Sequence, residues 1–292
     1  MTALKTQTSL PCDLDDISKP VAILYDNLFD GHPGSKLLID TLKNNDWEYV
    51  VVSIHDTYRG HKDKLLGYKA MLETLPADKV VVLTDSRDVV CCRNVKAFME
   101  GFASLESNFI VSLEAFCNQT SDQVTGRDLQ CVPLTTYWKH RNVTTWPVRK
   151  YVNSGLIAGK VANILEFFNY SIEKEFKDDQ VAFGTFMNEY PEKVYGDQDA
   201  TILHTTTFGK GGGLENCLLQ KHDSPTFAEL FGRAAFFLHV PGVTNKGQAV
   251  IYDFIKFCIL NGASSKKLNT LYDIPEWTWY QRPPGKIQYL KN

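Results

Sequence analysis

Two aspartates, Asp85 and Asp88, follow a run of apolar residues in the stretch VVVLTDSRDVV at positions 80–90. They are three residues apart, so a turn could direct both carboxylates at one hard cation, and oxygen ligands suit magnesium or manganese. An Asp-Ser turn is also common after a strand, because both side chains hydrogen-bond their own backbone. On this stretch alone, a metal site and an ordinary turn are about equally good interpretations.

A histidine, His239, ends another apolar run, AAFFLHV, and is followed by Gly242 and Lys246. A histidine at the end of a strand is more often a hydrogen-bonded structural residue than a metal ligand. Its value as a ligand therefore depends on whether it shares a crevice with the two aspartates.

Adjacent carboxylates, Asp178 and Asp179, occur in the sequence KDDQ at the start of a predicted helix. They are capping acids that favour the helix dipole, or, if they face a pocket, a base or a charge partner. Asn153, in the sequence NSG, is either part of a turn or a neutral hydrogen-bond partner for sugar hydroxyls.

The elements that would position these residues alternate between strand and helix. Continuous β-branched runs predict strands buried on both faces, and apolar residues at helical spacing predict the helices between them. The expected order is strand 20–26, helix 34–44, strand 47–54, helix 62–75 and strand 80–83. This alternation predicts an α/β fold with a mostly parallel central sheet flanked by helices. Ligands of such sheets bind beyond the carboxyl ends of the strands, where Asp85 and Asp88 are expected.

Further elements are predicted along the rest of the chain. They are a helix at 94–102, a strand at 108–116, a functional loop at 118–149, a strand with a glycine turn at 152–159, helices at 161–168 and 178–190, and a last strand at 234–240. Residues 1–19 are expected to be a flexible N-terminal arm, and residues 20–292 one domain whose aromatic tail, 273–285, packs back as a loop. The KGGG sequence at 210–213 lacks the spacing of a phosphate-binding loop.

Composition excludes several classes of partner. The chain has 31 basic and 34 acidic residues and a formal net charge of -3, which gives no electrostatic case for binding nucleic acid or an anionic membrane. The seven cysteines show no zinc-binding spacing and are expected to be reduced. With no apolar leader and no membrane-spanning run, a soluble and cytoplasmic protein is expected in preference to one of the secretory lumen.

Several motifs together resemble a known family, the glycosyltransferase domain of the procollagen lysyl hydroxylases and related collagen glycosyltransferases, which has the GT-A fold. The family's D-S-Y-D-V turn is similar to residues 85–89, and its S-A-E-x-F-C strand is similar to residues 112–117. Its N-S-G-G, D-D-Q, L-D-x-x-x-x-I-F-Q and V-V-H-G-N-G-P-T-K segments resemble the stretches that contain Asn153, Asp179, Asp197 and His239. The resemblance covers roughly residues 20–250 in the same order.

The resemblance implies a manganese-dependent transfer of glucose or galactose from a UDP-sugar to a hydroxyl acceptor, such as hydroxylysine of a collagen-like protein or a glycan. Asp85, Asp88 and His239 would hold manganese or, alternatively, magnesium. Lys246 would neutralise the diphosphate, while Asp178, Asp179 and Asn153 would form the catalytic group. The residues expected to contact the donor are Thr84, Asp85, Ser86, Gly242 and Lys246.

The sequence departs from the family at several points. Leu156 replaces the second glycine of N-S-G-G, and one extra residue precedes Lys246. Arg87 replaces an aromatic residue and is expected to be solvated, with a contact to the diphosphate as the alternative. No room for an iron domain follows residue 250, so no hydroxylation is expected. Two rival functions are a catalytically inactive nucleotide- or glycan-binding protein and a metal-dependent phosphoesterase, which would hydrolyse simple phosphate esters without a sugar donor.

Overall fold

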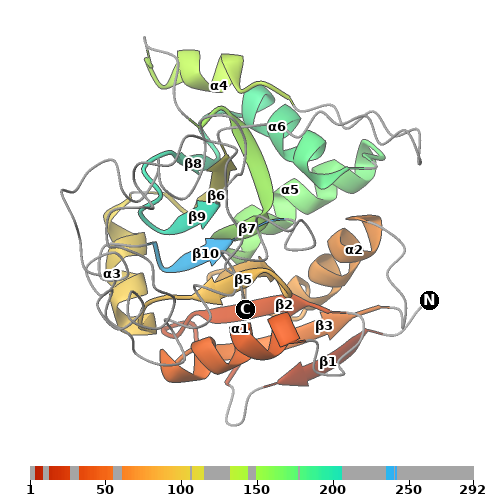
Figure 1. The fold of residues 1–292 in the computed structure, drawn as a ribbon. Helices are drawn as coiled ribbons and strands as arrows, with labels where there is room; N and C mark the ends of the chain where they lie inside the picture. Colours follow the sequence, from red (N-terminus) through yellow and green to blue (C-terminus); the bar gives the residue numbers. More distant parts are fainter. Residues whose placement is uncertain are drawn as a thin grey trace, which may run out of the picture.

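A computed structural model describes residues 4–8, 13–26, 33–54, 61–105, 107–114, 132–143, 149–176, 178–205, 235–239 and 241. Its centre is a seven-stranded sheet flanked by helices (Figure 1). In spatial order the strands are β1 (Lys5–Thr8), β3 (Glu48–Ser53), β2 (Val21–Tyr25), β4 (Val80–Asp85), β7 (Tyr151–Lys160), β6 (Phe109–Glu114) and β8 (Tyr195–Asp197). The predicted α/β class is confirmed.

Most strands of this sheet run in one direction. The pairs β2–β3, β2–β4 and β6–β8 are parallel, and β7 is inserted antiparallel between β4 and β6. As a result β2, β4, β6 and β8 all end at the same edge. An acid ends each of these strands or directly follows it, namely Asp26, Asp85, Glu114 and Asp197. The carboxyl edge of the sheet is therefore lined with carboxylates.

Helices cover both faces of the sheet. On one face lie α2 (His61–Leu72), α5 (Val161–Glu173) and α6 (Asp179–Glu189), and on the other lie α1 (Pro33–Asn44) and α3 (Val95–Ser104) (Figure 1). Along β4, Val81 and Leu83 belong to the first core cluster, and Val80 and Val82 belong to the second. Because successive side chains of a strand point to opposite faces, a strand covered on both sides reads as a continuous apolar run.

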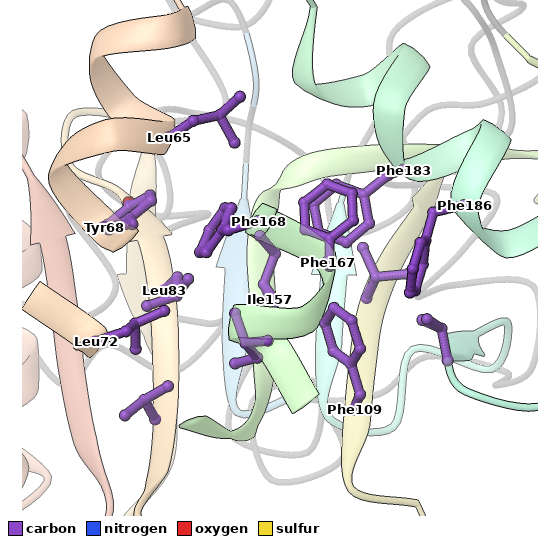
Figure 2. Close-up of a cluster of buried hydrophobic side chains, with 14 of the residues drawn as sticks. Leu65, Tyr68, Leu72, Leu83, Phe109, Ile157, Phe167, Phe168, Phe183 and Phe186 are labelled. Carbon is purple, nitrogen blue, oxygen red and sulfur yellow. The ribbon is translucent and has the colours of Figure 1, made fainter. Parts of the chain in front are cut away.

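The larger core cluster is rich in aromatic rings. Phe167 of α5 stacks on Phe183 of α6 with ring centroids 3.6 Å apart, and Tyr68 of α2 stacks on Phe168 at 6.2 Å. Figure 2 shows these rings above Leu83, Phe109 and Ile157 of the sheet. Their packing fixes the two helices, α2 and α6, whose first turns approach the carboxyl edge of the sheet.

A second sheet of three short strands lies next to the carboxyl edge of the main sheet. It contains β5 (Val89–Cys91), β10 (Phe237–His239) and β9 (Leu203–Thr205), in that order. β10 pairs antiparallel with β5 and parallel with β9. The strand β5, which begins one residue after Asp88, is not predicted by the sequence.

Three local predictions differ from the structure. Within the expected arm, β1 pairs antiparallel with β3 through the backbone, and its exposed side chains leave no apolar pattern in the sequence. Within the expected loop at 118–149 lies the helix α4 (Thr135–His140), whose N-terminus is capped by Asn188 of α6. The Asn188 side-chain oxygen accepts hydrogen bonds from the backbone N–H groups of Thr136 and Tyr137, both at 3.1 Å. The glycine turn expected at 152–159 is part of one strand, β7, in which the pairing with β6 slips around Gly155.

Candidate metal and donor site

The predicted ligands Asp85, Asp88 and His239 lie together. One ligand atom of each residue lies within 4.8 Å of the others, and His239 Nε2 is 3.3 Å from Asp88 Oδ1 and 3.7 Å from Asp85 Oδ2. Two carboxylates and an imidazole nitrogen form a donor set that binds divalent transition metals such as manganese. The residues present therefore fit the metal that the family resemblance implies.

The second sheet explains how His239 meets Asp88 and Asp85, which are 151 and 154 positions away in the chain. Asp85 ends β4, Asp88 lies in the turn that follows, and the chain then enters β5 at Val89. β10 pairs with β5 in a register that places His239 opposite Val89, beside the turn. Two short pairings, of β10 with β5 and of β10 with β9, thus hold the histidine beside the aspartates.

A glycine of β7, Gly155, makes room for the cluster. A Cβ atom at this position would lie 2.2 Å from His239 Cε1, 2.5 Å from His239 Nδ1 and 2.8 Å from Asp85 Oδ2. Carbon atoms do not approach so closely, so any side chain at position 155 would displace two candidate ligands. Gly155 is therefore part of the site, although it binds nothing itself.

The ring of His239 is oriented from behind by Asn153. His239 Nδ1 is 2.9 Å from Asn153 Oδ1, and the amide nitrogen of Asn153 donates to Glu114 Oε2 at 3.2 Å. Asn153 also accepts a hydrogen bond from the backbone N–H of Gly155 at 3.0 Å. Asn153, predicted as a partner for sugar hydroxyls, is buried and directs both polar atoms at the protein.

Electrostatic partners alter the ionisation of the cluster. Burial lowers the pKa of His239, but Asp88 and Asp85 raise it by more, and the pKa ends above the ordinary value. For Glu114, burial raises the pKa to about 7 against the opposing effects of Asn153, His239 and Gln180. Glu114 therefore titrates near neutral pH.

A buried lysine, Lys64 of α2, joins two of the predicted site residues. Its ammonium lies 3.0 Å from Asp85 Oδ1 and 2.7 Å from Asp179 Oδ2, and its side chain is 8% exposed. Burial lowers the pKa of Lys64, but Asp179 and Asp85 raise it more strongly, so that its pKa ends well above the ordinary value. Lys64 is thus a cation that holds the carboxylate of Asp179 next to Asp85 of the candidate metal site.

The sequence prediction missed Lys64, although a signal for it exists. Lys64 is four residues before Tyr68 and eight before Leu72, both of which belong to the buried face of α2. A lysine on the apolar stripe of a helix needs a charged partner, because burying an unpaired ammonium is costly.

The paired acids Asp178 and Asp179 have different environments. Asp178 is the N-cap of α6, and its Oδ1 accepts a hydrogen bond from the backbone N–H of Val181 at 3.0 Å. Asp179 is buried in the first turn of the helix and faces Lys64. Asp178 therefore acts as a helix cap, which is one of the two roles that the sequence suggested for these acids, whereas Asp179 faces the site.

The remaining predicted donor contacts lie on either side of Asp85 or outside the described residues. Thr84 and Ser86 are both buried, and the backbone oxygen of Thr84 accepts a hydrogen bond from Tyr68 at 2.6 Å. Gly242 and Lys246 lie outside the described residues, as do the KGGG turn and the aromatic tail.

Arg87 was expected to be solvated and is instead partly held by an acid. Its guanidinium donates to Asp26 Oδ1 at 3.3 Å, with 40% of the side chain exposed, and Ser35 also donates to Asp26. Asp26 follows β2, the strand next to β4, so the contact ties the Asp85–Asp88 turn to the neighbouring strand end. The sequence analysis did not predict this ion pair, because the partner is 61 positions away in the chain.

Asp197 supports a turn in the backbone. Its carboxylate accepts hydrogen bonds from the backbone N–H groups of Thr201, Ile202 and Leu203, at 2.9, 2.7 and 2.8 Å. These bonds shape the connection from β8 to β9 and thereby position the second sheet.

Among the described residues, no helix is both long and apolar enough to cross a bilayer.

Comparisons with known proteins give likenesses in structure alone. No family model and no curated protein matches the chain. A glycosyltransferase involved in the glycosylation of the major capsid of PBCV-1 is 10% identical over 79% of this chain and 98% of that chain, with a TM-score of 0.42. WbbM, a bifunctional glycosyltransferase, is 14% identical over 79% of this chain and 47% of its own, with a TM-score of 0.44. The galactosyltransferase LgtC, solved with donor and acceptor sugar analogues, is 11% identical over 76% of this chain and 87% of its own, with a TM-score of 0.37. At these identities and TM-scores the likenesses carry no argument about activity.

Proposed function

We propose that the protein is a manganese-dependent glycosyltransferase of the GT-A type that moves glucose or galactose from a UDP-sugar to a hydroxyl acceptor. The observation that supports this proposal is the cluster of Asp85, Asp88 and His239 at the carboxyl edge of the sheet. The family resemblance of the sequence supplies the donor and the candidate acceptor, hydroxylysine of a collagen-like protein.

The residues of the site divide into three tasks. Asp85, Asp88 and His239 would hold the divalent ion, which supplies positive charge to the leaving diphosphate. Asn153 and Gly155 keep the imidazole in place, the first by a hydrogen bond and the second by having no side chain. Lys246 is proposed to add a second positive charge near the diphosphate.

Asp179 is proposed to face the sugar or the acceptor. Lys64 holds the carboxylate of Asp179 beside the candidate metal ligands, because its one ammonium contacts both Asp85 and Asp179. A carboxylate fixed there would stabilise the positive charge of an oxocarbenium-like state or accept the proton of the acceptor hydroxyl. Asp178 contributes by capping the helix that carries Asp179.

Calorimetric titration of the metal-stripped protein with uridine diphosphate, with and without manganese, tests the proposal. Guanosine and adenosine diphosphates, which carry the same charge, are titrated separately for comparison. Binding that needs both uridine and manganese is expected, and its absence under all conditions would overturn the proposal. Hydrolysis of a simple phosphate ester without a sugar donor would instead support a phosphoesterase.

The variant Asp88→Ala should abolish metal-dependent binding of uridine diphosphate, because a donor set of two ligands holds the ion poorly. Asp78→Ala is the matched control, since Asp78 is a highly exposed acid that pairs with Lys160 on the surface. Wild-type affinity in Asp88→Ala would remove Asp88 from the site.

A further inference from the structure

Glu114, the acid at the end of β6, has no role in the proposed transfer. It is nevertheless connected to the candidate metal ligand His239 through hydrogen bonds of Asn153. Its side chain is buried, and a different side-chain amide donates to each of its carboxylate oxygens. Asn153 Nδ2 is 3.2 Å from Oε2, and Gln180 Nε2 is 3.3 Å from Oε1. Two donors on two oxygens suit a group that only accepts, which is a carboxylate.

The amide of Asn153 is held in one orientation by partners of fixed polarity. At its oxygen end, the backbone N–H of Gly155 donates at 3.0 Å, and a backbone N–H cannot act as an acceptor. At its nitrogen end lies the acceptor Glu114. If the amide were turned over, its NH2 group would face the N–H of Gly155, which is also a donor. Its oxygen would face the carboxylate of Glu114, which is also an acceptor.

The orientation of Asn153 in turn determines the tautomer of His239. Since Asn153 Oδ1 is an acceptor, His239 Nδ1, 2.9 Å away, must carry the hydrogen. Nε2 then keeps its lone pair and faces Asp88 and Asp85. Thr205 Oγ1, 3.5 Å from Nδ1, does not decide the matter because a hydroxyl can donate or accept.

Without this arrangement, the neighbours of His239 would favour the opposite tautomer. Two carboxylates beside Nε2 attract a hydrogen to that nitrogen, and an Nε2–H group cannot bind a metal. The hydrogen bonds from Glu114 through Asn153 counteract that preference, as partners behind metal-binding histidines commonly do.

We propose that Glu114 is a positioning residue that acts through Asn153 to hold His239 in the Nδ1–H tautomer, with Nε2 ready to bind a metal. This inference rests on the proposed metal site. Loss of such a partner typically weakens metal binding by about 10- to 100-fold.

The test compares two variants that change the polarity of the hydrogen bonds while conserving shape. In Glu114→Gln, the new amide offers one acceptor to two donors and removes the charge. In the double variant Glu114→Gln/Asn153→Asp, the amide at position 114 donates to the carboxylate at position 153, which accepts from Gly155 and His239. Gln180→Ala is the control, because it removes the other donor to Glu114 and leaves Asn153 in place.

Two measurements read the effect. Nitrogen-15 NMR of the metal-free protein, at a pH where the imidazole of His239 is neutral, reports its tautomer, and calorimetry reports the manganese affinity. Wild type, Gln180→Ala and the double variant should show Nδ1–H and similar affinities. Glu114→Gln should gain Nε2–H and bind manganese at least about tenfold more weakly.

The outcomes separate the inference from the metal proposal. A wild-type protein that binds no manganese refutes the metal proposal, and its tautomer still decides the inference, which Nε2–H would overturn. The inference is also overturned if Glu114→Gln retains the wild-type tautomer, or if the double variant fails to recover what the single variant loses.

Discussion

The clearest perturbation of the site is Gly155→Ala, which adds one methyl group next to the candidate metal ligands His239 and Asp85. The new Cβ would lie 2.2 Å from His239 Cε1, so the ring would have to retreat by roughly 1.3 Å to restore an ordinary carbon–carbon contact of about 3.5 Å. That shift would also break the hydrogen bond between His239 and Asn153 and press on Asp85. Overpacking of this kind costs about 1 to 3 kcal/mol of folding stability.

Metal binding should be weakened as well as stability. Metal–ligand distances tolerate changes of about 0.2 Å, and loss of the hydrogen bond that orients a metal-binding histidine typically weakens metal binding by about 10- to 100-fold, or about 1.4 to 2.8 kcal/mol. We therefore expect manganese affinity, measured by calorimetry, to fall about 10- to 100-fold in Gly155→Ala while urea unfolding remains cooperative.

Gly184→Ala is the matched control for added bulk. Its Cβ would lie 2.7 Å from Val132 Cβ, a contact in the packing of α6 that involves no candidate ligand. It should change stability and leave manganese affinity unchanged. Wild-type affinity in Gly155→Ala would refute the placement of His239 and Asp85 around this glycine.

Three further predictions concern the charged groups around the cluster. Lys64→Met should destabilise the protein by about 3 to 5 kcal/mol in urea unfolding, because it removes the ammonium that pairs with the buried carboxylate of Asp179, and an unchanged stability would contradict the buried ion pair. Asp179→Asn should bind uridine diphosphate nearly as well as wild type and turn over more slowly, whereas loss of nucleotide binding would assign the residue to the donor pocket or to the fold. The pKa of Glu114, about 7 when folded against an ordinary 4.5, means that the unfolded state holds fewer protons between these two pH values. The free energy of unfolding should therefore fall as pH rises through that window, by about 3 kcal/mol at most, and Glu114→Gln should remove this fall; an unchanged pH profile in that variant would contradict the burial of an ionisable group.

Local pattern was sufficient to predict five of the seven strands of the main sheet, β2, β3, β4, β6 and β7, and the helices that cover it. The continuous apolar runs of β2, β3 and β4 reflect burial on both faces, and this is a property that neighbouring residues along the chain display directly. The acids at strand ends could be predicted as site candidates for the same reason, since Asp85 immediately follows its apolar run. The strand β1 and the helix α4 could not be predicted, because backbone pairing with β3 stabilises the first and a cap from Asn188 stabilises the second.

The sequence by itself determined the α/β class, the place of Asp85 at the end of a buried strand and the candidacy of Asp88 and His239. The tertiary structure alone decided that His239 reaches the aspartates, because that contact depends on the short pairings of β10 with β5 and with β9, which are distant in sequence. It also decided that Lys64 and Glu114 belong to the site, one through ion pairs and the other through hydrogen bonds with residues distant in sequence. Such groups have no local signature of their partners, since charges and hydrogen bonds act through space and the chain order does not record which side chains meet.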